Sequence, residues 1–400
     1  MIRTTARRAG AVAALAITAA ATAQLGPLTP PGGAVSNTGP HLGQIEPRIP
    51  VGPETTPGDA DSIFRINKPG SYYLTSNLSA QPGREVVVFV EIDAENVTLD
   101  LNGFTIDGNN LVTRGIEAYP DHVRIFNGRV RETTGDAIDA RGNQMTLQDL
   151  EVMDVAGDGI LVARRSIVER CRVTDSGGRG FLIGSGSSVR HSAAFRCGAN
   201  GFDLLSGATA EACSASLNTG AGFELGDRAS VRNAYALANG GDGFVAGSGG
   251  VIDQCTAQGN ANGINAGQGV VITNNALINN LLNGIDADAG NHIEGNTCRL
   301  NDSNGILVRS SNTVLNNTVD ANDATGIRIL DEANRVDSNL VTSNDFHGIR
   351  TQFGSIDNFI VRNMLHQNTP GNMSVDVAGN FAPSTNTPNT TATFANIDRP

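Results

Sequence analysis

Residues 201–221 read GFDLLSGATAEACSASLNTGA, residues 222–242 read GFELGDRASVRNAYALANGGD, and residues 243–262 read GFVAGSGGVIDQCTAQGNAN. Each copy opens with a glycine that is followed by phenylalanine or, in other copies, isoleucine. A nearly constant interval between copies indicates one small structural unit stacked many times. The pair occurs as Gly159-Ile160, Gly180-Phe181, Gly201-Phe202, Gly222-Phe223, Gly243-Phe244, Gly263-Ile264, Gly284-Ile285, Gly305-Ile306, Gly326-Ile327 and Gly348-Ile349.

A second pattern runs in phase with the glycine pair. Each copy has an apolar residue, a small residue three positions later and another apolar residue two positions after that, as in Val189, Ser192 and Ala194. Looser copies reach back to Leu99 and bring the total to thirteen. Apolar residues alternate within runs of a few residues, which is the period of a β-strand. Gly, Asn, Asp and Ser separate these runs, as turns require.

Three short strands and three turns per copy predict an all-β solenoid, a single-stranded parallel β-helix with about 13 coils of ~21 residues. Each strand would pair with its counterpart one coil later, at the usual strand spacing of roughly 4.8 Å. Helical repeats are excluded because no copy carries an apolar face at helical spacing. Leucine-rich repeats are excluded because the Leu-x-x-Leu-x-Leu framework is missing.

Equivalent positions of a β-helix stack into columns. The sequence predicts an internal aromatic column of Phe181, Phe202, Phe223 and Phe244, continued by the isoleucines of the later pairs. It also predicts a turn column of Asn218, Asn239, Asn260, Asn280, Asn301, Asn322 and Asn344. Amides stacked in this way can hydrogen-bond along the column and to the turn backbone, so we interpret these residues as structural.

The start of the repeats resembles a known superfamily. The run TLDLNGFTIDG at 98–108, after GSYYLT at 70–75, resembles the beginning of right-handed β-helix proteins of the pectate-lyase-like superfamily. The coils that follow are similar to right-handed β-helix repeat proteins of bacterial envelopes. The resemblance covers about residues 60–378 and implies a right-handed coil. It does not select an activity, because this architecture carries lyases, hydrolases, epimerases, phage tailspikes and non-catalytic surface proteins.

The ends of the chain have their own composition. Arg3, Arg7 and Arg8 precede an apolar run, and Ala21-Thr22-Ala23 is a suitable cleavage site, so we expect export to the periplasm, the cell surface or the medium. The apolar run is too short to span a membrane. The predicted organisation is a signal peptide at 1–23, a Pro- and Gly-rich extended segment at 24–60, an N-terminal cap with the first strands at 61–98, the β-helix at 99–378 and a Thr-, Asn- and Pro-rich tail at 379–400.

Charge and cysteine content narrow the possible partners. The chain has 28 basic and 40 acidic residues and a net charge of −12, so nucleic acid is not expected as a partner. Cys171, Cys213 and Cys255 occupy the same position in alternate coils, roughly 9–10 Å apart and beyond disulfide reach. We therefore expect five free, buried thiols. We also expect a monomeric protein that requires no cofactor.

Candidate site residues follow the glycine pairs, where strand alternation turns a side chain outward. In lyases of the resembled superfamily, acidic residues on this face hold calcium and a basic residue removes a proton, which is sound chemistry for β-elimination. The resemblance thus implies a site between Asp203 and Arg350 that acts on an acidic glycan. Its members would be Arg328 as the base, Arg309, Arg350, Asp203 and Glu224 as substrate ligands, and Asp286 and Asp288 as possible calcium ligands.

Other features favour different functions. The hydrolase and epimerase motifs of the superfamily are absent, and Phe346-His347-Gly348-Ile349-Arg350 is the nearest approach to them. Coil length is nearly constant, with extra residues only around 109–119 and 352–359, so no long turns are expected to wall a cleft. Three classes stay open: a polysaccharide-interacting protein that could include lyase activity, a structural or adhesive surface rod, and an accessory protein for periplasmic metal insertion.

Overall fold

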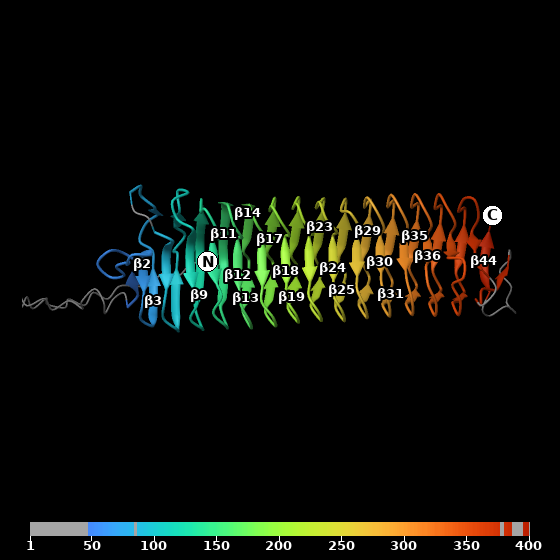
Figure 1. The fold of residues 1–400 in the computed structure, drawn as a ribbon, viewed down its shortest axis with the longest axis horizontal. Helices are drawn as coiled ribbons and strands as arrows, with labels where there is room; N and C mark the ends of the chain where they lie inside the picture. The colour runs from blue at the N-terminus through green and yellow to red at the C-terminus, as the bar shows by residue number, and fades with distance from the viewer. Residues whose placement is uncertain (1–46, 84–85, 377–379, 386–394, 400) are drawn as a thin grey trace, which may run out of the picture. The chain divides into compact units, whose positions relative to one another are not determined.

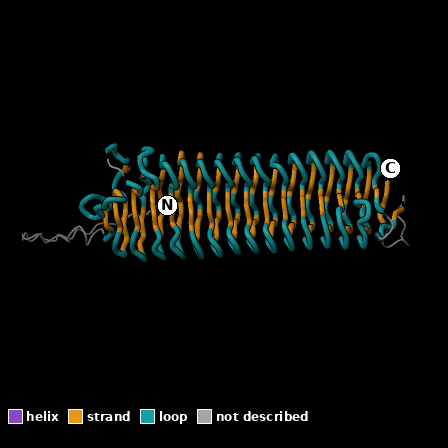
Figure 2. The backbone as a smooth tube through the Cα atoms, viewed as in Figure 1, coloured by secondary structure: helices purple, strands orange, loops and turns teal. Residues whose placement is uncertain are grey.

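The computed structural model describes residues 47–83, 86–376, 380–385 and 395–399 (Figure 1). The predicted signal peptide, the first part of the 24–60 segment and much of the tail lie outside these residues. Strands joined by turns make up the described part, and Figure 2 shows their regular succession without a helix. Accordingly, no described helix is long and apolar enough to cross a membrane.

One coil contains three short strands. In the coil that begins at Gly201, these strands are β18 (Phe202–Leu204), β19 (Thr209–Glu211) and β20 (Ser214–Ser216). Each pairs in parallel with its counterpart in the next coil, for example Phe202 with Phe223. The first strand of every coil belongs to a 15-stranded sheet, and the other two belong to a 29-stranded sheet. The predicted parallel β-helix is confirmed.

The two sheets have the following strands. The 15-stranded sheet contains β2 (Ser62–Ile66), β5 (Val88–Ile92), β8 (Arg114–Ala118), β10 (Ile138–Ala140), β12 (Ile160–Val162), β15 (Phe181–Ile183), β18, β21 (Phe223–Leu225), β24 (Phe244–Ala246), β27 (Ile264–Ala266), β30 (Ile285–Ala287), β33 (Ile306–Val308), β36 (Ile327–Ile329), β39 (Ile349–Thr351) and β42 (Met373–Ser374). The 29-stranded sheet contains β1 (Ile49–Pro50), β3 (Gly70–Tyr73), β4 (Leu78–Ser79), β6 (Val97–Asp100), β7 (Thr105–Asp107), β9 (Arg124–Arg131), β11 (Thr146–Val155), β13 (Ile167–Glu169), β14 (Arg172–Ser176), β16 (Ser188–Arg190), β17 (Ala193–Phe195), β19, β20, β22 (Ser230–Arg232), β23 (Tyr235–Leu237), β25 (Val251–Asp253), β26 (Thr256–Gln258), β28 (Val271–Thr273), β29 (Ala276–Ile278), β31 (His292–Glu294), β32 (Thr297–Arg299), β34 (Thr313–Leu315), β35 (Thr318–Asp320), β37 (Arg335–Asp337), β38 (Leu340–Thr342), β40 (Phe359–Val361), β41 (Met364–His366), β43 (Ser384–Thr385) and β44 (Asn396–Arg399).

The number of coils is about 15 rather than the 13 predicted. The difference arises at both ends: β2, within the segment predicted as the N-terminal cap with the first strands at 61–98, adds one coil, and β42 adds another after the last predicted copy. Strand β2 pairs with β5, and β5 pairs with β8, in the same sheet as the later coils. These first coils are longer than the later ones, so the period of the later coils does not reveal which of their residues are partners. At the other end, β44 pairs with β41, so residues beyond 378 extend the 29-stranded sheet.

The core is a narrow column between the sheets. The rings of Phe181, Phe202, Phe223 and Phe244 stack with centroids 4.6, 4.8 and 5.1 Å apart, as the sequence predicts. Buried isoleucines continue the column toward the C-terminus. The glycine before each of these residues is required by close packing. A Cβ atom on Gly222 would lie 2.7 Å from the carbonyl oxygen of Gly243.

Three long columns of mostly buried asparagines run along corners of the described coils, and a shorter one joins Asn262, Asn283 and Asn304. The predicted column is confirmed, and each member donates from its side-chain amide and backbone N–H to the Oδ1 atom of the next, as Asn239 does to Asn260. Sequence reasoning did not identify the other two as ladders. One contains Asn275, Asn296, Asn317, Asn339, Asn363 and Asn396, and the other contains Asn291, Asn312, Asn334, Asn358 and Asn380. The columns satisfy turn backbone that would otherwise be buried without partners.

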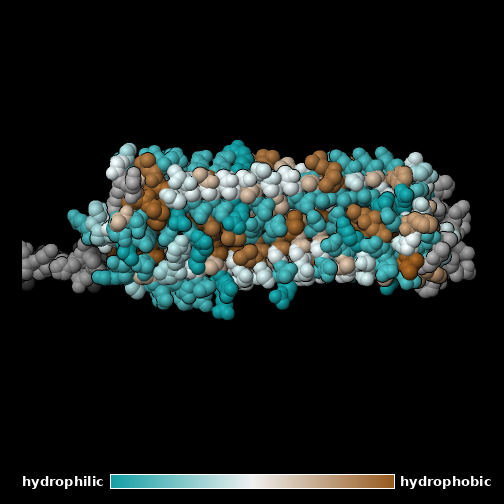
Figure 3. All heavy atoms as spheres, in the orientation of Figure 1, coloured by the Kyte–Doolittle hydropathy of each residue, from teal (hydrophilic) through white to brown (hydrophobic). Residues whose placement is uncertain are grey.

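The face seen in Figure 3 is mostly hydrophilic, with scattered hydrophobic side chains among charged and polar ones. This pattern follows from strand alternation, because the residue between two inward side chains points to solvent. The outward residues of the 15-stranded sheet are the ones that the sequence singles out for a functional site.

Candidate functional site on the 15-stranded sheet

Outward residues of the 15-stranded sheet stand in one continuous column. Register partners place them in the order Arg65, Glu91, Glu117, Asp139, Leu161, Leu182, Asp203, Glu224, Val245, Asn265, Asp286, Leu307, Arg328, Arg350 and Ser374. The residues after the glycine pairs are expected to face solvent. Leu161 is the exception, because it is only 3% exposed. Of the predicted site residues, the column carries Asp203, Glu224, Asp286, Arg328 and Arg350, whereas Asp288 and Arg309 lie just after β30 and β33.

Asp203 and Glu224 are neighbours in this column but differ in their surroundings. Asp203 accepts a hydrogen bond from Asn200 at 2.7 Å and lies 3.3 Å from the guanidinium of Arg179. No described residue forms an ion pair with Glu224. Burial by its neighbours raises the pKa of Glu224, and the negative charges of Asp203 and Asp242 raise that pKa further. Asp203 thus has a cationic partner, which it shares with Asp158, whereas Glu224 has none among the described residues.

Asp286 and Asp288 are bridged by an arginine of the next coil. The guanidinium of Arg309 lies 2.8 Å from Asp286 and 3.0 Å from Asp288. Its positive charge stands where a calcium ion would need to sit between the two carboxylates. No group of three or more His, Cys, Asp or Glu residues that could hold a metal occurs in the described residues. This arrangement does not fit calcium, which takes six to eight oxygen ligands.

Arg328 and Arg350 form a cationic pair on adjacent strands. They are register partners in β36 and β39, so their backbones are about 4.8 Å apart. No carboxylate in the described part of the chain forms an ion pair with either residue. Arg328 donates a hydrogen bond to Gln352 at 3.2 Å, and Arg350 lies over the ring of Phe346, 5.1 Å from its centroid. Burial lowers the pKa of Arg328, and the charge of Arg350 lowers it further.

A pocket of about 410 Å³ adjoins this pair. It is lined by Ser310, Leu330, Asp331, Glu332, Gln352, Phe353, Gly354 and Ser355. The turn at 352–355 forms one side and is closed by a hydrogen bond from the N–H of Ser355 to the carbonyl oxygen of Gln352. Phe353 at the tip of this turn is 95% exposed. The extra residues noted in the sequence thus present a large aromatic side chain to solvent beside the cationic pair.

The structure does not gather the predicted site into one centre. Glu224 and Arg328 are separated by five coils, which is about 24 Å along the column at the usual strand spacing. A general base must lie within hydrogen-bond reach of the proton that it removes. Arg328 and the acidic pair Asp203 and Glu224 therefore cannot act on the same sugar ring.

Sequence reasoning missed an ionic cluster at the N-terminal end of the same column. Asp139 is fully buried and contacts Arg141 at 2.5 Å, Arg114 at 3.3 Å and the hydroxyl of Tyr119 at 3.2 Å. Glu117 lies beside it and pairs with Arg114 at 2.9 Å. The sequence signal for this cluster is the earlier pair Gly115-Ile116, which lies two ordinary repeat intervals before Gly159-Ile160, with Ala137-Ile138 between them. Because arginines and Tyr119 surround Asp139, we interpret the cluster as a structural network.

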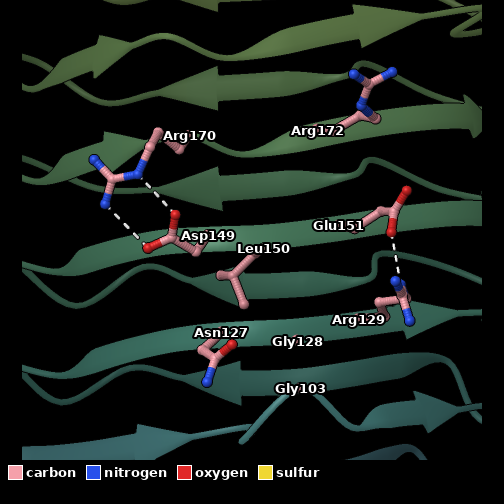
Figure 4. A pocket seen from close by; sticks show the side chains of 9 residues that line it. All are labelled: Gly103, Asn127, Gly128, Arg129, Asp149, Leu150, Glu151, Arg170 and Arg172. Atoms are coloured by element: carbon pink, nitrogen blue, oxygen red, sulfur yellow. Dashed lines mark hydrogen bonds and ion pairs between the residues drawn. The ribbon is translucent and has the colours of Figure 1, made fainter.

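A second pocket lies on the 29-stranded sheet, with a volume of about 380 Å³ (Figure 4). Gly103 and Gly128 are among its lining residues. Its charged walls are largely self-paired, because Arg170 binds Asp149 at 2.7 Å and Arg129 binds Glu151 at 2.7 Å. This pocket contains none of the residues that the sequence predicts for the site.

Two family models match the chain. The model described as the right-handed β-helix region matches residues 90–239 and 136–282. The model described as the periplasmic copper-binding protein NosD matches residues 211–395. No curated protein sequence gives a significant match.

Solved structures with a similar course of the chain are distant in sequence. The A-module of the mannuronan C-5 epimerase AlgE4 from Azotobacter vinelandii is 14% identical, with 78% of this chain and 90% of that chain covered and a TM-score of 0.44. A mutant tailspike protein of the E. coli bacteriophage HK620, in complex with a hexasaccharide, is 12% identical over 79% and 69%, with a TM-score of 0.43. Pectate lyase Pel9A is 17% identical over 79% and 68%, with a TM-score of 0.29. The paired coils and the family model for the right-handed β-helix region identify the chain as a right-handed parallel β-helix protein.

Proposed function

We propose that this protein binds an acidic polysaccharide through Arg328 and Arg350. The observation that carries the proposal is the pair of neighbouring guanidinium groups without a carboxylate partner in the described residues. Two like charges on adjacent strands repel each other, and an anion bound between them would remove that cost. The planar guanidinium donates two parallel hydrogen bonds to a carboxylate, so a uronic acid is a suitable ligand.

Binding is better supported than cleavage. An arginine keeps its proton in proteins because its pKa lies far above neutral pH, so we do not expect the lowering of the pKa of Arg328 by burial and by Arg350 to make it a base. The acidic residues Asp203 and Glu224 of the predicted site are five or more coils away. The proposed role is therefore a non-catalytic, carbohydrate-binding one on an exported protein.

The proposal is tested by measuring binding to oligosaccharides of alginate, pectate and hyaluronan by isothermal titration calorimetry. The double variant Arg328→Ala/Arg350→Ala should lose at least tenfold in affinity and keep its melting temperature. Arg228→Ala/Arg232→Ala is a matched control, because it removes the same charge from two exposed residues that form no ion pair within the described chain. The proposal fails if no acidic oligosaccharide binds, or if the two double variants bind equally well.

Periplasmic metal delivery is the second candidate function, and the match of residues 211–395 to the copper-binding family favours it. Thiolates are strong copper ligands, but burial raises the pKa of Cys213 to about 11 and that of Cys255 to about 12. These thiols would bind copper only after the coil opens. Titration with Cu(I) under a competing chelator tests this candidate, and stoichiometric binding by the native protein would support it over the glycan proposal.

A further inference from the structure

The surroundings of the arginine pair restrict the direction in which a glycan could lie. Along the solenoid axis, Arg328 is followed by Leu307 and then by Asp286, and Arg350 is followed by Ser374. The outward column thus offers positive charge in two consecutive coils, next to the uncharged Leu307 and Ser374, and Asp286 beyond Leu307 is already paired with Arg309. A run of uronic acids laid along the axis would leave the cationic pair after two coils and would then face Leu307 or Ser374, which offer no charge to a carboxylate.

Across the coils, parallel to the strands, the surroundings are different. Gln352 lies two residues beyond Arg350, which is about 6.6 Å in an extended chain and comparable to one sugar ring. It accepts a hydrogen bond from Arg328 and also lines the adjoining pocket of about 410 Å³. Gln352 therefore joins the cationic pair and the pocket into one continuous surface.

The pocket suits an uncharged sugar. Phe353 supplies an exposed ring, against which the C–H face of a sugar can pack. Asp331 and Glu332 are exposed, line the pocket and form no ion pair with described residues. Their carboxylates can accept hydrogen bonds from sugar hydroxyl or amide groups. The same two charges would repel a second uronic acid at this place.

Building on the proposed function, we infer that the protein binds a glycan in which a uronic acid alternates with a neutral sugar, and that this glycan lies across the coils. Arg328 and Arg350 hold the carboxylate, and the neutral neighbour occupies the pocket between Phe353 and the acidic pair. A polyuronate places a carboxylate on every ring and so meets the charges of Asp331 and Glu332. The surface therefore selects an alternating glycan over a homopolymer of uronic acid.

The absence of tryptophan from the sequence makes the test direct, since Phe353→Trp introduces a single indole fluorophore at the pocket. The probes are hexasaccharides of hyaluronan and of unsulfated chondroitin, which alternate, and a hexamer of galacturonic acid, which does not. We expect the alternating hexasaccharides to shift the emission and to bind at least tenfold more tightly. The control Tyr235→Trp lies on the 29-stranded sheet, where Tyr235 is 61% exposed, and its emission should not respond.

Variants of the pocket separate the inference from the function on which it rests. Asp331→Asn/Glu332→Gln should raise the affinity for the galacturonic acid hexamer and so reduce the preference at least threefold. Phe353→Ala should weaken binding of the alternating hexasaccharides about tenfold. If the galacturonic acid hexamer binds as tightly as the others and the arginine double variant abolishes its binding, the inference is wrong and the proposed function stands. If none of the hexasaccharides binds, both are wrong.

Discussion

Asn239 donates from its side-chain amide to Oδ1 of Asn260 at 2.9 Å, and its backbone N–H donates to the same oxygen at 3.0 Å. Asn260 in turn donates to the carbonyl oxygen of Ala236 at 3.0 Å. The side chain of Asn260 therefore satisfies two donors of Asn239 and the carbonyl oxygen of Ala236, at a corner where the chain cannot form strand hydrogen bonds. This relation repeats from coil to coil and explains why asparagine recurs at a buried position.

We expect Asn260→Ala to lower the unfolding free energy by about 3 kcal/mol, because it leaves buried polar groups of Asn239 and Ala236 without partners. Differential scanning calorimetry would measure the loss. Asn265→Ala is the control, since Asn265 is exposed and donates one hydrogen bond, to Asp242 at 3.0 Å. Equal melting temperatures for the two variants would contradict a stabilising ladder.

Gly222→Ala should also destabilise the protein, by about 1–3 kcal/mol. The added Cβ atom would lie 2.7 Å from the carbonyl oxygen of Gly243 and 2.9 Å from Cβ of Ala236, so neighbouring coils would have to separate. Gly371→Ala is a matched control, because its Cβ atom would meet nothing nearer than 3.6 Å, at the ring of His347. Thermal unfolding followed by circular dichroism compares them, and an unchanged Gly222→Ala variant would show that the coils can separate without cost.

Much of the fold follows from the sequence because its period exposes which residues are equivalent. Phe202 and Phe223 occupy the same position in consecutive repeats, and the prediction that their rings stack is confirmed. The first coils are harder to recognise, because the interval from Ser62 to its partner Val88 is longer than the period of the later coils. Stacking at one position is a property of the repeat, so it can be predicted where the period is constant.

Charge pairing could not be predicted in the same way. Arg179 reaches both Asp158 at 2.7 Å and Asp203 at 3.3 Å, across one coil in each direction. Such pairs depend on the conformations that long side chains adopt over neighbouring coils. The strand register does not specify those conformations. The sequence therefore predicts which residues share the outward column of the 15-stranded sheet. It did not predict that Arg309 neutralises Asp286 while Arg328 has no carboxylate partner among the described residues.

Alternation within β21 predicts opposite results for two adjacent substitutions. Phe223→Asp places an unpaired charge in the aromatic column and should cost several kcal/mol. Glu224→Gln should be neutral or stabilising at pH 7. The pKa of Glu224 is raised in the folded state, so its ionised form opposes folding and stability increases as the pH falls toward that pKa. Melting temperatures between pH 4 and 7 test both points, and a similar loss for the two variants would refute the alternation.

The cysteines should be free and unreactive in the native protein. All five are buried, and burial raises the pKa of Cys171 to about 12 and that of Cys213 to about 11. Thiolate, the reactive form, is therefore scarce at neutral pH. Titration with a thiol reagent should find five groups in denaturant without reductant, and slow modification without denaturant. Fewer than five groups would reveal a disulfide, and rapid modification of the native protein would show that the coils open readily.

Asp337 should make stability depend on pH in the acidic range. Burial alone would raise the pKa of its carboxyl group, but hydrogen bonds from Arg362, Arg335 and Ser338 outweigh burial and hold that pKa at about 2. Its ordinary value is 3.8, so the stabilisation is complete above about pH 4 and is lost as the pH falls through 2. Because both arginines are partly exposed, we expect Asp337→Asn to cost only about 1–2 kcal/mol at pH 7. Urea unfolding of both proteins from pH 2 to 7 would measure the difference, which should shrink toward pH 2, and a difference independent of pH would contradict the ionic role of Asp337.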